Sequence, residues 1–230
     1  MSQMIGENQL ALSAEIISSD CLGVITDMDG LLLDSESWAI NAWIMGCKEL
    51  GYELPLEIAF SGVGLGREPF KKRLREFFGA QFDVETATKY RVKMGNEILQ
   101  RDGMAKRPGA DEFLNAVRSS KLPFGLATST FKEEALLRMK YANIDAGIFD
   151  AITFGDEITK LKPEPEIYLN VAQKLNIDPE KVVAFEDSLS GVNSALAAGM
   201  KVICIPDMVV YSPPNHPNVI LKKSLLECIV

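Results

Sequence analysis

The stretch Val24-Ile25-Thr26-Asp27-Met28-Asp29-Gly30 decides the fold of this chain. Three β-branched residues lead into two carboxylates one residue apart, which predicts a buried strand that ends at Asp27 or shortly after it. Ligands bind at the carboxyl ends of strands in open α/β sheets, so Asp27 and Asp29 are expected at a binding edge. Two neighbouring carboxylates repel each other, and a divalent cation with oxygen ligands relieves that repulsion. A solvated acidic turn is the alternative interpretation.

Strands and helices alternate along the second half of the chain. The predicted strands are 124–127, 151–154, 182–185 and 202–205, and the predicted helices are 111–119, 132–142, 165–175 and 190–198. Short apolar runs separated by helices of about ten residues are typical of repeated βαβ units. We therefore predict an α/β fold with a Rossmann-like parallel sheet as its core.

The segment between the first strand and this region has a different pattern. From about residue 35 to residue 107, apolar residues recur at three- and four-residue spacing, which predicts helices. We predict an inserted α-helical domain at residues 36–106, within a core formed by residues 22–35 and 107–230. Residues 1–21 are expected to form an N-terminal arm with one or two helical turns.

The composition excludes several classes of protein. The chain has 230 residues, of which 47% are hydrophobic and 24% charged, an ordinary globular balance. Its formal net charge of −8 argues against binding to nucleic acid or to an anionic membrane, which usually requires a basic stripe. We see no apolar run that could span a bilayer and no signal-like start, so a cytoplasmic location is expected. The oligomeric state stays open, with a monomer preferred.

Cysteine and histidine usage narrows the chemistry further. None of the four cysteines forms a Cys-x-x-Cys pair, and their spacing suits neither zinc nor a disulfide framework. The single histidine, His216, excludes a multi-histidine metal site and lies in a proline-rich loop. Acid–base chemistry is therefore expected from carboxylates or lysine.

Polar residues follow each predicted strand. They are Asp27, Asp29, Thr128, Asp156, Glu186, Asp187 and Asp207. A parallel sheet brings such strand ends to one edge, so a single polar site is favoured over scattered loop acids. Asp27 could attack phosphorus as a nucleophile, and Asp29 could serve as general acid and then base. Glu186 and Asp187 would complete an oxygen-rich site for Mg2+.

A phosphate group at this edge would need positive or donor groups. The Thr128 hydroxyl, together with Ser129 and the backbone N–H groups at the start of the next helix, could supply donors. Lys162 could supply positive charge, and its rigid flanks Pro163 and Pro165 favour it over Lys160. A solvated loop charge is the alternative interpretation for either lysine.

Four motifs in order resemble those of the haloacid-dehalogenase-like (HAD) phosphohydrolases, in the branch with a helical cap inserted after the first motif. They are Asp27-Met28-Asp29-Gly30-Leu31-Leu32-Leu33-Asp34-Ser35-Glu36, Leu126-Ala127-Thr128-Ser129-Thr130, Lys162-Pro163-Glu164-Pro165-Glu166-Ile167-Tyr168 and Phe185-Glu186-Asp187-Ser188, the last followed by Gly191 and Ala197-Ala198-Gly199-Met200. The resemblance covers about residues 22–207. Leu31 departs from the threonine that many members carry there, although apolar residues also occur in the capped branch.

The resemblance implies a magnesium-dependent phosphatase that forms an aspartyl-phosphate on Asp27. It gives Asp29 the acid–base role and a contact to the metal through its backbone carbonyl. It also implies that Thr128 and Lys162 bind phosphate, and that Asp27 and Asp187 bind the metal with Glu186 beside them. The first motif is most similar to small sugar-phosphate phosphatases such as 2-deoxyglucose-6-phosphate phosphatase, so a small phosphorylated metabolite is the expected partner.

Other activities within the family remain open. Asp29 argues against a dehalogenase, which has no need of an acid–base group at that position. A phosphotransferase similar to β-phosphoglucomutase would carry a histidine twelve residues after the nucleophile, where this chain has Ala39, so hydrolysis is favoured and the mutase is the alternative. Phosphonate hydrolases need a cap lysine, for which Lys48 is a candidate. A non-catalytic binding protein is a further hypothesis, which the intact carboxylate pair disfavours.

Substrate specificity is expected to come from the cap. The candidates are Glu36, Trp43 and the loop at residues 62–67, in which Arg67 could contact a sugar or a second anionic group. Packing in the core of the cap is the alternative interpretation for Trp43, and a surface charge is the alternative for Arg67.

Overall fold

The computed structural model describes residues 10–64, 66–208 and 211–230, without the side chain of Arg67. Within these residues one parallel sheet of six strands has the order β3-β2-β1-β4-β5-β6. The strands are β1 (Gly23–Thr26), β2 (Phe124–Ala127), β3 (Ala151–Thr153), β4 (Val182–Glu186), β5 (Lys201–Cys204) and β6 (Val219–Leu221). The predicted α/β class with a Rossmann-like parallel core is confirmed.

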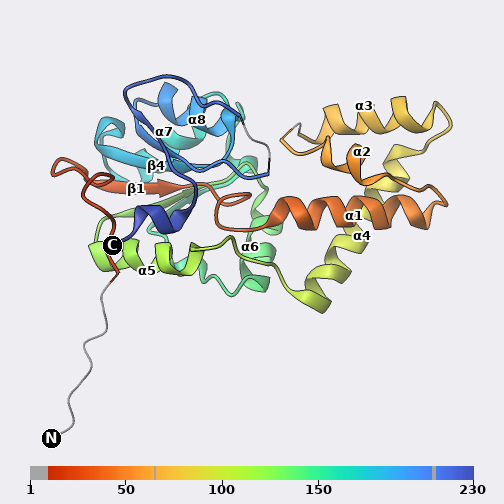
Figure 1. Cartoon of the computed structure of the whole chain (residues 1–230), viewed down its shortest axis with the longest axis horizontal. Coiled ribbons are helices and arrows are strands. Elements are labelled where there is room, and N and C mark those ends of the chain that lie inside the picture. The colour runs from red at the N-terminus through yellow and green to blue at the C-terminus, as the bar shows by residue number, and fades with distance from the viewer. Residues whose placement is uncertain (1–9, 65, 209–210) are drawn as a thin grey trace, which may run out of the picture.

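Strand β1 lies at the centre of this sheet, between β2 and β4. All four of its residues are buried, which agrees with its run of apolar and β-branched residues. Successive strand residues point to opposite faces, so Val24 packs in the core on one face and Ile25 in the core on the other. The end of β1 points toward helix α1 (Figure 1).

Helices cover both faces of the sheet (Figure 1). Helices α5 (Ala110–Ser120) and α6 (Lys132–Tyr141) share one core cluster with β1, and α7 (Glu166–Leu175) and α8 (Leu189–Ala197) share the other. Four short 3-10 turns complete the described core: η1 (Ala146–Ile148), η2 (Gly155–Glu157), η3 (Pro179–Lys181) and η4 (Leu225–Cys228). The sheet is therefore the middle layer of three.

The segment after β1 forms a separate group of helices beside the sheet (Figure 1). They are α1 (Ser35–Glu49), α2 (Leu56–Phe60), α3 (Arg67–Phe78) and α4 (Val84–Asp102). They enclose a hydrophobic cluster of their own, in which the ring of Trp43 meets that of Phe70 edge-on at 5.4 Å between centroids. Trp43 is therefore a packing residue here. The short helix α2 was not predicted from the sequence.

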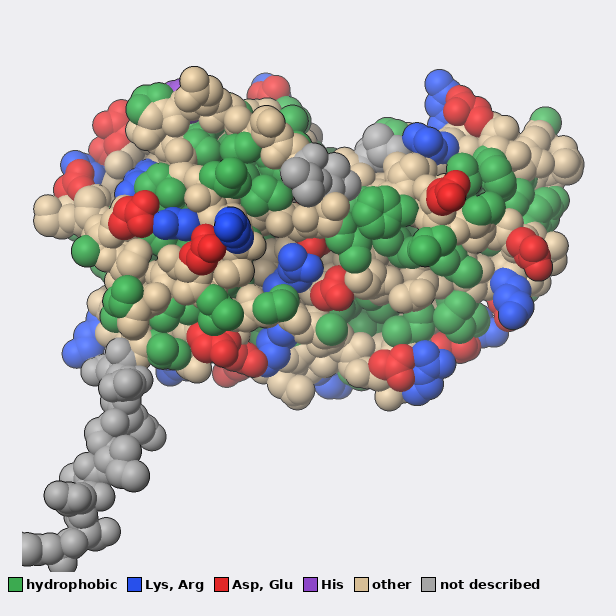
Figure 2. All heavy atoms as spheres, in the orientation of Figure 1, with side chains coloured by type: hydrophobic (Ala, Val, Ile, Leu, Met, Phe, Trp, Pro, Cys, Tyr) green, Lys and Arg blue, Asp and Glu red, His purple; other side chains and the backbone are tan. Residues whose placement is uncertain are grey.

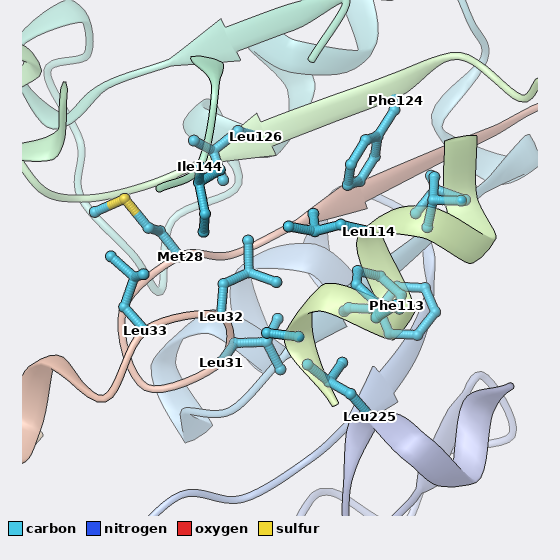
Figure 3. Packing of buried hydrophobic residues seen from close by; sticks show 14 of the residues in the cluster. Met28, Leu31, Leu32, Leu33, Phe113, Leu114, Phe124, Leu126, Ile144 and Leu225 are labelled. Carbon is cyan, nitrogen blue, oxygen red and sulfur yellow. The ribbon is translucent and has the colours of Figure 1, made fainter. Parts of the chain in front are cut away.

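The two connections to these helices run side by side. Asp34 donates its backbone N–H to Ala105, and Arg107 donates its N–H to Leu32, each at 2.9 Å. Figure 3 shows Leu31, Leu32 and Leu33 pointing into the core against Phe113, Leu126 and Leu225. Burial of three consecutive leucines anchors the chain immediately before it enters α1.

Four further observations bear on the sequence expectations. The strand β6 was not predicted. Residues 13–17 make one turn, closed by the N–H of Ile17 on the carbonyl of Ser13 at 3.1 Å, and Ile16 is fully buried in the main core. Within the described ranges, none of the helices combines the length and apolar character needed to cross a bilayer. On the face shown in Figure 2, the described basic and acidic side chains are interspersed and do not gather into a basic stripe.

Candidate active site

The sheet brings three carboxylates together at its carboxyl edge. Asp27 follows β1, while Glu186 ends the neighbouring strand β4 and Asp187 comes next. One oxygen from each of these side chains lies within 4.8 Å of the others. The central position of β1 explains this meeting, because its end is flanked directly by the end of β4.

Lys162 enters this cluster from the loop before α7. Its Nζ donates to Asp27 Oδ1 and to Glu186 Oε1, both at 2.6 Å, and to the carbonyl of Ala127 at 3.0 Å. Only 7% of its side chain is exposed. Lys160 is exposed instead, and its backbone N–H donates to Glu166 at 2.9 Å. Of the two candidate lysines, the structure brings Lys162 into the site.

Glu186 is fully buried and held by several donors. The Tyr168 hydroxyl donates to its Oε1 at 2.6 Å. Its other oxygen accepts the N–H groups of Asp187 and Ser188 at 3.1 and 3.3 Å and the Ser188 hydroxyl at 3.2 Å. A Cβ at Gly191 would lie 1.9 Å from Oε1, so a residue without a side chain is needed there. The carboxylate of Glu186 is thus rigidly placed.

Asp187 is the member of the cluster that lacks a partner. Its Oδ1 is buried and has no hydrogen-bond partner among the described residues. Burial raises its pKa well above the ordinary value, and the neighbouring Glu186 and Asp27 add to that rise. Its Oδ2 would lie 2.3 Å from a Cβ at Gly30, which has a φ of +79°. An orphaned carboxylate oxygen beside two further acids suits a hard cation with oxygen ligands.

Asp27 experiences the same crowding. Burial raises its pKa to about 7 against the opposing effect of Lys162, while Glu186 and Asp29 push it further up. The pKa of Lys162 is raised, because the attraction of Asp27 and Glu186 outweighs the effect of burial, which alone would lower it. A cation bound among these acids would favour the ionised form of Asp27.

Asp29 lies in different surroundings. Arg138 Nη1 donates to its Oδ1 at 2.6 Å, and the hydroxyl of Thr130 donates to its Oδ2 at 2.7 Å. Burial would raise its pKa, but Arg138 and hydrogen bonds from Thr130 and Ser35 outweigh burial and lower the pKa below its ordinary value. The two carboxylates of the first motif therefore have pKa values shifted in opposite directions, because they lie in different surroundings.

Two of the three predicted phosphate-binding residues lie just after β2. Thr128 is buried, and its hydroxyl lies 3.4 Å from Asp29 Oδ2 while it accepts the N–H of Thr130 at 3.1 Å. Ser129 is exposed on the loop between β2 and α6. Thr128 and Ser129 therefore both lie on the loop between β2 and α6.

Two acids at strand ends lie outside the carboxylate cluster. Asp156 accepts the backbone N–H of Lys132 at the start of α6, at 2.9 Å. Asp207 forms an ion pair with Arg107, at 2.7 Å between Nη1 and Oδ1. The expectation that the strand-end acids meet therefore holds for Asp27, Glu186 and Asp187 but not for Asp156. Asp207, paired with Arg107, lies close enough for its charge to raise the pKa of Asp187.

The candidates on the helical insertion are placed as follows. Glu36 is half-buried in the first turn of α1, and burial, followed by the charges of Asp29 and Asp207, raises its pKa to about 7. Lys48 is exposed near the other end of α1. The side chain of Arg67 lies outside the described part of the structure. Glu36 is therefore the candidate that the structure places near Asp29.

Sequence reasoning missed Arg138 as a partner of Asp29. On α6 the buried residues are Ala135, Arg138 and Met139, at three- and four-residue spacing. A charged residue within such a buried stripe was the available signal, because an unpaired charge is almost never fully buried. The partner 109 positions away could not be read from the sequence.

Comparison with known proteins identifies the family of this site. A model of the haloacid dehalogenase-like hydrolase family matches residues 24–205, which is most of the chain. The chain belongs to this family. This confirms the resemblance seen in the four motifs. The first and last of these motifs meet at the edge of the sheet where Asp27 lies.

Relatives of this hydrolase cover nearly the same length. A phosphorylated carbohydrates phosphatase from Thermotoga maritima is 36% identical over 180 residues, which span 78% of this chain and 82% of that protein. A phosphoglycolate phosphatase from Nitrosospira multiformis is 35% identical over 189 residues, which span 80% of this chain and 82% of that protein. The solved structure of a candidate β-phosphoglucomutase from T. maritima superimposes with a TM-score of 0.74 at 30% identity, covering 90% of this chain and 95% of that one.

Proposed function

We propose that this hydrolase removes the phosphoryl group from a small phosphomonoester, a sugar phosphate, through an aspartyl-phosphate on Asp27. The observation that carries the proposal is the 2.6 Å contact between Lys162 Nζ and Asp27 Oδ1 at the carboxyl edge of the sheet. A carboxylate held beside a buried cation is suited to attack an anionic phosphate. Hydrolysis of small phosphorylated compounds is also supported by the family and by the named activities of the two relatives.

The residues present fit a bound Mg2+. Asp27 and Asp187 would hold it through carboxylate oxygens, and Asp29 through its backbone carbonyl. Glu186 is a neighbour whose oxygens already accept bonds from Lys162, Tyr168 and the following residues, so its part would be to orient the cluster. When bound, the ion would neutralise charge on the phosphoryl oxygens. The orphaned Oδ1 of Asp187 supports this assignment.

The reaction would proceed in two steps. In the first, an Asp27 oxygen attacks phosphorus and the bond from phosphorus to the leaving oxygen breaks, while Asp29 gives that oxygen a proton. In the second, Asp29 takes a proton from water, the water oxygen attacks phosphorus, and the bond from phosphorus to Asp27 breaks. Asp27 returns to its free carboxylate and inorganic phosphate leaves. Thr128, Ser129 and Lys162 would hold the phosphoryl oxygens throughout.

The helices α1–α4 would act as a cap over this edge of the sheet. They are inserted directly after the first motif, and the end of β1 points toward them (Figure 1). Glu36, in the first turn of α1, would accept a hydrogen bond from a sugar hydroxyl. A cytoplasmic location and a monomeric state stay predictions of the sequence.

A β-phosphoglucomutase-like phosphotransferase is the second candidate. The similarity to the candidate β-phosphoglucomutase of T. maritima, over most of both chains, favours it. Ala39 disfavours it, because the side chain at that position is too small and apolar to hold the acid–base carboxylate. Conversion of a hexose 1-phosphate to the 6-phosphate, faster than phosphate release, would support the mutase over the phosphatase.

A substrate panel with two variants tests the proposal. We expect phosphate release from at least one sugar phosphate, dependent on added Mg2+ and abolished in Asp27→Asn. The matched control is Asp156→Asn, which also removes an acid that follows a strand but lies outside the cluster. Asp156→Asn should keep the activity of the wild type. Undiminished activity in Asp27→Asn would refute the proposal.

A further inference from the structure

Arg138 joins three parts of the molecule through one side chain. It belongs to α6, and only 10% of its side chain is exposed. Its Nη1 binds Asp29 Oδ1 at 2.6 Å, at the end of β1. Its guanidinium carbon lies 4.7 Å from the centre of the Trp38 ring, on α1. Arg138 therefore contacts both the segment after β1 that carries Asp29 and the helical insertion.

Stability alone does not account for an arginine at this place. Burying a charge pair costs desolvation energy, and replacing such a pair by apolar residues of similar size is often neutral or stabilising. Ala135 and Met139, the buried neighbours of Arg138 on α6, are apolar. A residue of the same kind would have sufficed for packing, so the contact with Asp29 needs another explanation.

The two oxygens of Asp29 are held in different ways. Oδ1 is occupied by Arg138, whereas Oδ2 is held by the hydroxyls of Thr130 at 2.7 Å and Thr128 at 3.4 Å. Hydroxyl groups can rotate toward a phosphate, but a guanidinium bound to a carboxylate keeps its planar geometry. Because Thr128 is itself a proposed phosphate ligand, Oδ2 is the oxygen that lies beside the phosphoryl site.

We propose that Arg138 is a positioning residue for the acid–base carboxylate: it fixes Oδ1 of Asp29 so that Oδ2 faces the leaving oxygen. This inference rests on the acid–base role proposed for Asp29. It adds a residue outside the four motifs to the machinery of proton transfer.

Trp38 provides the surface against which Arg138 is held. Its Nε1 donates to the carbonyl of Gly95 on α4 at 3.0 Å, and a Cβ at Gly95 would lie 2.7 Å from the ring. The ring is therefore wedged between α1 and α4. A cation over an aromatic ring is attracted to the face of that ring, which favours one orientation of the guanidinium.

Two substrates whose leaving groups differ in their need for a proton can show whether Arg138 positions Asp29 or only supports the structure of the site. The alcohol that leaves para-nitrobenzyl phosphate needs a proton, whereas the nitrophenolate that leaves para-nitrophenyl phosphate does not. General acid catalysis contributes roughly a hundredfold or more. Asp29→Asn should therefore lower kcat/KM, which reports the first step alone, by about that factor with the benzyl ester and far less with the phenyl ester. Arg138→Met should lower kcat/KM for the benzyl ester by roughly tenfold to a hundredfold and for the phenyl ester by less than about threefold.

Arg91→Met is the matched control. The guanidinium of Arg91 lies 4.8 Å from the centre of the same Trp38 ring, and its Nη1 forms an ion pair with Glu134 Oε1 at 3.9 Å. We expect this variant to treat the two esters alike. Arg138→Lys keeps a charge near Asp29 and should recover part of the loss with the benzyl ester. It also serves as the test if Arg138→Met does not fold.

The outcomes separate this inference from the function on which it rests. Equal losses of kcat/KM with both esters in Asp29→Asn would overturn the role of Asp29 as general acid, and the role of Arg138 with it. If Asp29→Asn loses more activity with the benzyl ester than with the phenyl ester, but the Arg138 variant loses the same with both, the role of Arg138 alone is overturned. The Arg138 variant is Arg138→Met, or Arg138→Lys if Arg138→Met does not fold. We expect a larger loss with the benzyl ester than with the phenyl ester in both Asp29→Asn and the Arg138 variant, and no such difference in Arg91→Met.

Discussion

Replacing Glu36 with glutamine should stabilise the protein above neutral pH. Glu36 is half-buried near Asp29 and Asp207, and burial, followed by these two charges, raises its pKa from 4.5 to about 7. Below 4.5 the carboxyl is protonated in both the folded and the unfolded chain. As the pH rises from there through 7, the unfolded chain releases this proton more readily, so the stability that the raised pKa contributes is lost.

The size of the effect follows from the difference in pKa. One pKa unit corresponds to about 1.4 kcal/mol, so the full difference corresponds to about 3 kcal/mol. Because Glu36 keeps some contact with solvent, we expect about 1 to 3 kcal/mol. Glutamine carries no charge at any pH, so Glu36→Gln should gain this amount relative to the wild type between pH values of about 5 and about 8.

Urea unfolding at the two pH values, with a chelator present, measures the gain. Comparison of the variant with the wild type at each pH removes the titration of other groups that the two proteins share. The control is Glu49→Gln, which removes an exposed carboxylate at the opposite end of α1 and should change the free energy of unfolding little. If Glu36→Gln gains as much at pH of about 5 as at about 8, or gains nothing, the electrostatic account of this residue is wrong.

Three other substitutions test the carboxylate cluster. Lys162→Met leaves Asp27 and Glu186 without their buried cation and should cost roughly 3 to 5 kcal/mol in urea unfolding together with most activity, whereas Lys160→Met should cost little. Asp187→Asn should weaken Mg2+ binding in isothermal titration calorimetry at least about tenfold, and unchanged affinity would contradict its assignment as a ligand. Gly191→Ala places a methyl group 1.9 Å from Glu186 Oε1 and should lower the free energy of unfolding by roughly 1 to 3 kcal/mol; a variant as stable as the wild type would contradict the close packing.

The strands and most helices were predictable because their burial leaves a clear pattern. Strands β1 and β2 are buried on both faces and read as unbroken apolar runs. Strand β6 was missed because its residues are half-buried or exposed and follow a proline-rich loop. Helix α2 was missed because its five residues are too few to show a helical period.

The site was predictable where side chains follow strands and obscure where they come from helices. The meeting of Asp27, Glu186 and Asp187 follows from strand order in a parallel sheet, which βαβ patterns imply. Arg138 reaches Asp29 from α6, and the side of α6 that faces the loop depends on how the helix packs. The buried partner Tyr168 of Glu186 depends on packing in the same way. Contacts that depend on helix orientation therefore could not be predicted from a single sequence.

The central position of β1 explains how two carboxylates so close in sequence acquire different chemistry. On the β4 side, Asp27 meets Glu186, Asp187 and the loop lysine Lys162, a setting in which burial and acids raise its pKa. On the β2 side, Asp29 meets the donors of the loop before α6 and the guanidinium on α6 itself, which lower its pKa. An edge strand has a neighbour on one side only and could offer one of these settings but not both. The order β2-β1-β4 is thus what gives the two carboxylates of one short motif the separate surroundings that their proposed roles require.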